Sequence, residues 1–154
     1  MKTRCFSCDV QCLPEIRTFV RESLVQLAVP HQMAAAMVLA VEEICTNVII
    51  HGNQRNGLRQ LQVSLGRGDG FLVVETRDNG TPFNPQAYRE HTIEELIEAR
   101  RRGGMGLQLA HRLMDRLDYH RHGNQNVWTL YKRIACSHAE HIRSHGADHG
   151  QLQP

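Results

Sequence analysis

Apolar positions recur with two different periods along the first third of the chain, and these periods predict its first elements. Residues 2–8 alternate in polarity and predict a short strand, after which Asp9 is a candidate helix N-cap. Apolar side chains at helical spacing between residues 13 and 27 predict a helix that ends before Pro30. A second predicted helix runs from about His31 to Ile50 and stops at the polar loop that follows.

The middle of the chain predicts a β-hairpin. The runs LRQLQVSLG and GFLVVETRD alternate in polarity on either side of RGDG. Leu61, Val63 and Leu65 would then share one face of the hairpin, and polar side chains would wet the other face. Two prolines and a glycine in NGTPFNPQ end the second strand.

The last third of the chain predicts three further elements. The segment TIEELIEARRR is a candidate short helix. A longer helix opens after GGMG, with apolar positions from Leu107 to Met114, and ends at Leu117. The turn RHGNQN leads to a final strand, VWTLYKRIA. The sum is a sheet of about four mostly antiparallel strands with helices on one face, which is an α/β two-layer sandwich.

The same pattern divides the chain into one domain, residues 1–135, and a His-rich tail, residues 136–154. Four histidines in the tail are three or four positions apart, so on a helix they would align and could bind a metal. Gly146 and Gly150 disfavour such a helix, and we expect the tail to be disordered. The four are His138, His141, His145 and His149.

Composition and charge indicate an ordinary globular protein and bear only weakly on its partners. An apolar content of 41% and a charged content of 22% are ordinary for a globular domain. The net charge of +2 is too small to indicate a nucleic acid or an anionic membrane surface as partner. The apolar run Met33–Ile50 is interrupted by Glu42, Glu43 and Asn47 and does not predict a membrane span. No secretory signal is evident, so we expect a cytoplasmic protein with reduced cysteines.

Cys5, Cys8 and Cys12 have the spacing C-x2-C-x3-C near the N-terminus. A structural metal site would need a fourth ligand, which this spacing does not supply. We therefore expect ordinary packing, with Cys8 on the same face as Phe6 and Cys5 on the opposite face.

Three polar groups of residues interrupt this pattern. Glu43 and Asn47 are four positions apart on the second helix and project from one side of it. Asp78 ends a strand in DNGTPFNP, where Gly80 allows a close approach to the backbone. In RRRGGMGL, arginines and glycines precede a helix N-terminus, which is a potential anion site. Each alone has an ordinary structural explanation: a satisfied polar pair, a turn, and a loop before a helix.

The order of the three groups is more specific than any one of them. No P-loop is present, and GGMGLQL does not complete G-x-G-x-x-G because Leu109 takes the last position. E-x-x-x-N on a helix, D-x-G-x-P-F after a strand and G-x-G-L opening a helix together resemble the GHKL ATPase superfamily. EEICTNVIIHG, DNGTPFNP and GGMGLQLAHRLMD look closest to the anti-sigma-factor serine kinases, from about Asp9 to Arg133. The resemblance implies the Bergerat ATP-binding fold, in agreement with the predicted sandwich.

The resemblance also implies roles in binding ATP and Mg²⁺. Asn47 would hold the metal, and Glu43 would be the general base for a water or a serine hydroxyl. Glu42 is a neighbouring candidate, but it lies about 100° round the helix from Glu43. Asp78 would accept a hydrogen bond from the adenine amino group, while Gly80 would admit the ring.

Other positions of the resemblance concern the phosphates and the edge of the adenine pocket. A lid, residues 85–103, would cover the nucleotide, and Arg102 within it would pair with the γ-phosphate or with a partner protein. Thr129 would close the adenine pocket. Asn84 stands where the family often has aspartate, and His51 matches the family without a role that we can assign. Backbone N–H groups that would cradle the phosphates belong to Gly104, Met105, Gly106 and Leu107.

The function that the resemblance implies is that of an ATP-dependent serine/threonine protein kinase. Its partners would be a sigma factor, which it sequesters, and a STAS-domain antagonist, which it phosphorylates, and it would form a homodimer. An alternative is an interaction module that binds nucleotide without phosphoryl transfer. A histidine-kinase catalytic piece is disfavoured, since no room remains for a phospho-accepting helix pair, and a topoisomerase-like ATPase would need a transducer domain.

Overall fold

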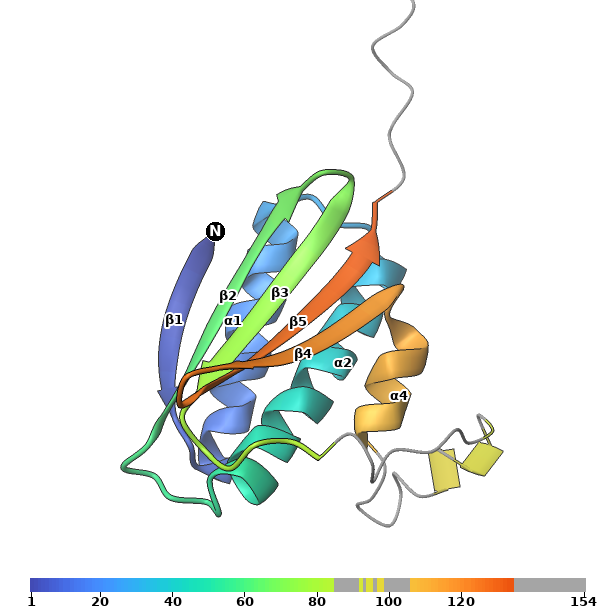
Figure 1. Ribbon diagram of the computed structural model, residues 1–154. Helices are drawn as coiled ribbons and strands as arrows, with labels where there is room; N and C mark the ends of the chain where they lie inside the picture. The colour runs from blue at the N-terminus through green and yellow to red at the C-terminus, as the bar shows by residue number, and fades with distance from the viewer. Residues whose placement is uncertain (85–91, 93, 96, 99–105, 135–154) are drawn as a thin grey trace, which may run out of the picture.

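The fold consists of a five-stranded antiparallel sheet with helices packed on one face (Figure 1). This computed structural model describes residues 1–84, 92, 94, 95, 97, 98 and 106–134. The strand order is β1-β2-β3-β5-β4, and every neighbouring pair is antiparallel. The strands are β1 (Lys2–Ser7), β2 (Gln60–Gly68), β3 (Phe71–Asp78), β4 (Arg116–His122) and β5 (Gln125–Arg133).

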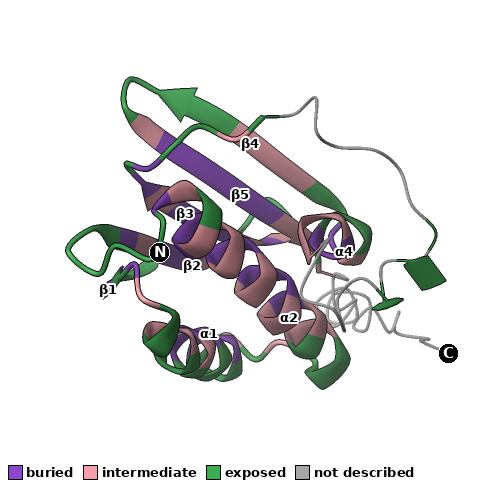
Figure 2. Cartoon of the chain, turned by 90° about the horizontal axis from the view of Figure 1, so that it is seen from below, coloured by how far each residue is buried: buried purple, intermediate pink, exposed green. Residues whose placement is uncertain are grey.

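Three helices of the described residues cover one side of this sheet, as the view from below shows (Figure 2). They are α1 (Leu13–Gln26), α2 (His31–Asn47) and α4 (Gly106–Leu113), and a short 3-10 turn (Val10–Cys12) precedes α1. Beyond Asn47 the chain continues as a single π-helical turn, Val48–Gly52. The predicted two-layer sandwich is therefore confirmed.

The core lies between the sheet and α2. Leu61, Val63 and Leu65 alternate on β2 and are all buried on the helix side, as the hairpin pattern predicts. Met37, Val41 and Ile44 of α2 are completely or almost completely buried in the same cluster. The segment His31–Gly52 has the length and the mean hydropathy, 1.8, of a membrane span. Its packing in the core accounts for that composition.

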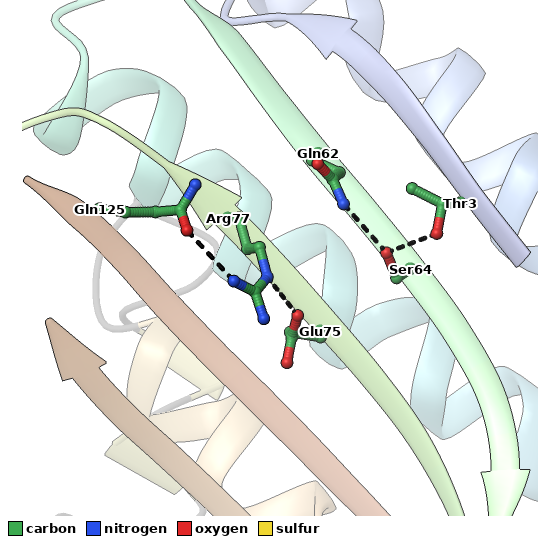
Figure 3. Close-up of polar contacts among 6 residues, drawn as sticks. All are labelled: Thr3, Gln62, Ser64, Glu75, Arg77 and Gln125. Carbon is green, nitrogen blue, oxygen red and sulfur yellow. Dashed lines mark hydrogen bonds and ion pairs between the residues drawn. The ribbon is translucent and has the colours of Figure 1, made fainter. Parts of the chain in front are cut away.

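The opposite face of the sheet carries polar side chains that bond to one another across the strands (Figure 3). On β1 and β2, Thr3 Oγ1 lies 2.8 Å from Ser64 Oγ. On β3, Arg77 forms an ion pair with Glu75 and donates to Gln125 Oε1 of β5 at 3.1 Å. The wetted face that the hairpin pattern predicts is confirmed.

The strand count from sequence, about four, is wrong by one. β4 spans Arg116–His122, where the sequence indicated the end of a helix at Leu117 and then a turn. Gly123, with φ of 62°, makes the tight turn into β5. No residue of β4 is fully buried, so the strand lacks the alternation of apolar and polar residues that reveals a half-buried strand.

The structure also bears on several local predictions. Asp9 caps the turn before α1, since its Oδ1 accepts from Gln11 N at 2.9 Å. Phe6 and Cys8 are buried while Cys5 is exposed, as their spacing predicts. Thr92 and Glu95 exchange the two hydrogen bonds of a capping box, which fits the expected short helix. The His-rich tail, residues 136–154, lies outside the described residues.

Candidate functional site

A pocket of about 150 Å³ opens where α2 and β3 end. Both of these ends lie toward the lower edge of the sheet in Figure 1. Its lining comes from the end of α2 with the π turn, from the segment after β3, and from β4 and β5. The lining residues are Asn47, Val48, His51, Gly52, Asp78, Thr81, Pro82, Phe83, Asn84, Tyr119, Asn126 and Trp128.

Asp78 is the acidic residue of this lining, and it is only 4% exposed. Its Oδ1 accepts three hydrogen bonds: from Gly80 N at 2.7 Å, from Asn53 Nδ2 at 3.1 Å and from Asn126 Nδ2 at 3.1 Å. No described residue donates to Oδ2. One carboxylate oxygen is thus fixed by the protein, and the other remains available as a hydrogen-bond acceptor for a ligand.

The π turn gives the pocket its wall and brings two segments of backbone together. A widened turn leaves carbonyl groups without their usual helical partners. Asn53 Nδ2 donates to Val48 O at 2.9 Å, and Thr81 N donates to Gly52 O at 2.7 Å. A Cβ on Gly80 would overlap the carbonyl oxygen of Gly52, so this close approach requires glycine. The turn also places His51 in the lining of the pocket. The sequence alone had assigned this residue no role.

Three aromatic side chains form one side of the pocket beside Asp78. The ring centroids of Phe83 and Trp128 are 4.9 Å apart, those of Tyr119 and Trp128 are 4.8 Å apart, and those of Phe83 and Tyr119 are 5.5 Å apart. These edge-to-face and tilted contacts hold the rings rigidly. A flat heteroaromatic ligand would find both apolar contact and a carboxylate acceptor in this pocket.

The two adjacent glutamates of α2 have different environments. Glu42 forms an ion pair with Arg17 of α1, with Arg17 Nη2 2.6 Å from Glu42 Oε1. Glu43 faces α4, and a Cβ added to Gly106 would overlap its carboxylate. Glu43 thus lies at the N-terminus of α4, one helical turn before Asn47, which lines the pocket. No described residue forms a side-chain hydrogen bond with Asn47.

Comparison with known proteins shows the family of the chain. Residues 6–132 match the family model described as histidine kinase-like ATPase domain. The chain belongs to this family.

The relatives of this histidine kinase-like ATPase domain include serine-protein kinases named RsbW. The chain is 30% identical to RsbW of Bacillus licheniformis over 89 residues, which cover 50% of this chain and 51% of the relative. It is 34% identical to RsbW of Halalkalibacterium halodurans over 88 residues, covering 52% and 51%. The chain thus spans about half the length of the curated relatives that it matches.

Solved structures share the fold of the domain. The RsbU and RsbW domains of Rv1364c from Mycobacterium tuberculosis align with a TM-score of 0.58 and 18% identity, over 87% of this chain and 33% of that one. The SiaB-SiaC complex of Pseudomonas aeruginosa aligns with a TM-score of 0.56 and 16% identity, over 87% and 90%. At these identities the likeness shows the fold of a histidine kinase-like ATPase domain and no more.

Within the domain, two of the described candidate residues line the pocket, and three others lie against neighbouring segments. Asn47 and Asp78 line it, and Gly80 lies behind Asp78 against the π turn. Glu43 meets Gly106 at the start of α4, and Leu107 follows in the first turn of that helix. Other candidates lie outside the described residues, namely Arg102, Gly104 and Met105, with nearly all of the expected lid, residues 85–103.

Thr129 is the candidate that the structure does not bring to the pocket. It pairs with Glu75 across the sheet, and its neighbour Trp128 lines the pocket. Successive side chains on a strand point to opposite faces, so Thr129 points to the face without helices. The residue of β5 that contacts Asp78 is Asn126, three positions earlier. The expectation for Thr129 is therefore corrected.

The sequence analysis also missed Asn53, Tyr119, Asn126 and Trp128. Asn126 and Trp128 are two positions apart, so a correct register for β5 would have placed both on the helix side. Tyr119 lies on β4, the strand that was not predicted. Asn53 directly follows the glycine that ends the π turn, and an asparagine at the end of a helix is the signal that could have indicated it.

Proposed function

We propose that this domain binds ATP in the pocket and transfers the γ-phosphoryl group to a serine or threonine of a partner protein. The observation that carries the proposal is the position of Asp78, Asn47 and Glu43. In space, Asp78 is the acceptor beside the aromatic rings of the pocket, Asn47 lines the same pocket, and Glu43 lies one helical turn from Asn47 at the N-terminus of α4. This order matches the order of base, phosphates and nucleophile along a bound ATP.

The base end of the pocket supports adenine as the ligand. Asp78 Oδ2 is free to accept a hydrogen bond from an exocyclic amino group. The rings of Phe83, Tyr119 and Trp128 provide apolar contact area for a purine. Gly80 acts here indirectly, because it lets the loop after β3 approach the π turn and so holds Asp78 in place.

The phosphate end has residues that suit a metal–nucleotide complex. Asn47 offers an amide oxygen, the kind of ligand that Mg²⁺ accepts, and the side chain is not engaged by any described residue. When bound, Mg²⁺ would neutralise negative charge on the phosphates. The N-terminus of α4, with Gly106 and Leu107, offers backbone N–H groups to the same anions. Gly104, Met105 and Arg102 remain proposals for this end.

Glu43 is the proposed general base. Its carboxylate lies beside the start of α4, where the γ-phosphate would be held, and it is half-buried. A base in that place would accept the proton of an incoming serine hydroxyl as it attacks the phosphorus. Glu42 is a poor alternative because Arg17 holds it against α1.

The named relatives support a role in partner switching. We propose that the phosphorylated partner is a STAS-domain antagonist, that a sigma factor is sequestered, and that the domain works in the cytoplasm as a homodimer. The printed name of the RsbW relatives, serine-protein kinase, supports transfer to a serine, and the chain matches about half of their length. The partners, the location and the homodimer follow from the motif resemblance to the anti-sigma-factor serine kinases.

Phosphoryl transfer from radiolabelled ATP to a STAS-domain protein of the source organism tests the proposal. We expect Glu43→Gln to lower the transfer rate by about 100-fold or more, since a general base contributes ~10² to 10⁴. Binding of ATP should persist in this variant. Glu42→Gln, its matched control on the same helix, should transfer at nearly the wild-type rate.

Two outcomes would contradict the kinase proposal. Equal transfer by wild type and Glu43→Gln would remove Glu43 from the chemistry. Tight binding of ATP without transfer to any partner would instead support a module that uses ATP only to set its conformation.

A further inference from the structure

The geometry points to Asn126 as the positioning residue that makes the pocket select a purine with an amino group, because it holds Asp78 as a pure hydrogen-bond acceptor. Arg121 and Tyr119 of β4 in turn fix the orientation of Asn126. This inference rests on the proposed binding of ATP and concerns how the base is chosen.

The orientation of the Asn126 amide is determined from both of its ends. The side chain is 2% exposed. Its Oδ1 accepts from Arg121 Nη1 at 2.7 Å and from Tyr119 Oη at 2.8 Å. A guanidinium can only donate, so the amide oxygen must face Arg121. The amide nitrogen must then face the other side of the residue.

On that other side the amide nitrogen meets three oxygens. Asn126 Nδ2 donates to Asp78 Oδ1 at 3.1 Å, to Gly80 O at 3.1 Å and to Thr81 O at 3.3 Å. Carbonyl oxygens only accept, so they require the same orientation as Arg121 does. Asn126 thereby joins β4, β5 and the loop after β3 in one network.

The two carboxylate oxygens of Asp78 therefore have different hydrogen-bond partners. Oδ1 is saturated by donors from Asn126, Asn53 and Gly80. Oδ2, to which no described residue donates, would be the acceptor for a ligand. A 6-amino purine places an N–H group against such an oxygen, whereas a 6-oxo purine places a second acceptor there. A site built to receive a hydrogen bond strongly rejects an analogue that lacks the donor.

β4 also brings a positive charge toward the carboxylate. Among the described residues, no lysine or arginine forms an ion pair with Asp78. Arg121 reaches it through the amide of Asn126, and it also donates to Gly80 O at 3.2 Å. A buried carboxylate without a cation needs such oriented donors to stay charged.

The test compares the affinities of ATP and ITP, which differ at the 6-position of the base, in the wild type and in Asn126→Asp. The new carboxyl group would keep the bonds from Arg121 and Tyr119 and would place an oxygen against Asp78 Oδ1. The two carboxyls would then share one proton, and Asp78 would no longer be a pure acceptor. We expect the preference for ATP over ITP to fall by about 10-fold or more.

The pH dependence of binding gives a second readout that a purely structural role would not move. In Asn126→Asp the shared proton replaces the amide donor at low pH and is lost as pH rises. Once that proton is lost, Asp78 is again an acceptor only, so the preference for ATP over ITP should recover with rising pH in the variant alone. The groups facing position 126 are Asp78 from β3 and Tyr119 and Arg121 from β4, and His51 lines the same pocket. Wild type contains the same His51, so its profile serves as the reference.

Arg121→Met supplies a second variant in case Asn126→Asp does not fold, as judged by thermal unfolding. It should weaken ATP binding several-fold without a new pH dependence. Arg67→Met is the matched control, since Arg67 is an exposed arginine that donates to a backbone carbonyl, Leu27 O, at 2.9 Å. Arg67→Met should bind ATP like the wild type.

The outcomes separate this inference from the proposed function. A wild type that binds no nucleotide would overturn the proposed function itself. A wild type that prefers ATP, together with a folded Asn126→Asp that keeps this preference and a wild-type pH profile, would overturn the role of Asn126 alone.

Discussion

Gly106, the first residue of α4, lies directly against the carboxylate of Glu43 on α2. A Cβ at Gly106 would overlap Glu43 Oε2 and approach its Cδ to 2.9 Å. The glycine thus fixes how closely the two helices approach at the proposed catalytic position. A helix N-terminus has positive dipole character and free N–H groups, so it favours a carboxylate or a phosphate beside it.

Gly106→Ala should lower the rate of phosphoryl transfer more than it lowers ATP affinity. The added methyl group must push the Glu43 carboxylate aside, and a base displaced by about 1 Å can lose ~100-fold in rate. Transfer assays and equilibrium binding on the same protein check this. Gly68→Ala is the control, because an added Cβ there meets no atom within 4 Å. Equal losses in both variants would show that the contact with Glu43 is irrelevant.

Gly80→Ala should destabilise the folded domain. Its Cβ would overlap the carbonyl oxygen of Gly52 and come within 2.8 Å of Asn53 Nδ2, and the first of these atoms belongs to the backbone. Overpacking of this kind costs about 1–3 kcal/mol in free energy of unfolding. Urea denaturation, with Gly68→Ala as reference, measures the difference. A stability like that of the reference would mean that the loop moves freely away from the π turn.

The sequence was informative where side chains alternate or recur strongly. The two faces of β2 and the buried side of α2 followed from such patterns. The grouping of Asp78 with Asn47, which both line the pocket, came instead from the resemblance of their ordered motifs to the GHKL ATPases. Patterns of apolar and polar residues do not predict a strand that lies at the edge of the sheet and has no fully buried residue, as in β4. The misplacement of Thr129 has the same origin, since a strand register cannot be read without knowledge of its partners.

The π turn is a second feature that the sequence alone did not reveal. An apolar run such as Val48–Ile50 is compatible with a regular helix, and no residue in it requires a wider turn. The tertiary bonds from Asn53 and Thr81 to the carbonyls of Val48 and Gly52 stabilise the wider form. Such long-range partners are invisible in a local pattern. The same turn places His51 at the pocket.

Trp128 should report nucleotide binding by its fluorescence. It is the sole tryptophan of the chain, it is 4% exposed, and it lines the pocket. A purine stacked or packed near its indole changes the polarity and quenching of that fluorophore. Titration with ATP and Mg²⁺ should give a saturable change in emission. An unchanged spectrum, alongside binding detected by calorimetry, would place the base elsewhere.

Asp78→Asn should reverse the base preference in the same fluorescence titration. The oxygen of the new amide would keep the donors from Asn126 and Gly80, and its NH₂ group would then face the ligand. A donor in that place repels the amino group of ATP and suits the 6-oxo group of ITP. We expect ATP affinity to fall by about 100-fold or more and ITP to bind better than ATP. Val73→Ala on the opposite face of β3 provides a control.

Cysteine reactivity should follow burial in the folded domain. Cys5 is exposed, whereas Cys8 and Cys45 are completely buried. Burial raises the pKa of Cys8 to about 11 and raises that of Cys45 further, so both thiols stay protonated near pH 8. An alkylating reagent should modify Cys5 quickly and the two buried thiols only in denaturant. Peptide mapping by mass spectrometry separates these sites from Cys136, which lies outside the described residues.

Alkaline pH should weaken the folded state through the same two thiols. Their pKa values are raised in the folded protein above the unfolded value near 9, so the unfolded chain releases these protons first. Stability should therefore be constant below about pH 8 and fall as pH rises from 9 to 11. Urea denaturation of the wild type and of Cys8→Ala across this range measures the effect, and the variant should show a shallower decline. An equal slope in both proteins would contradict the assignment to Cys8.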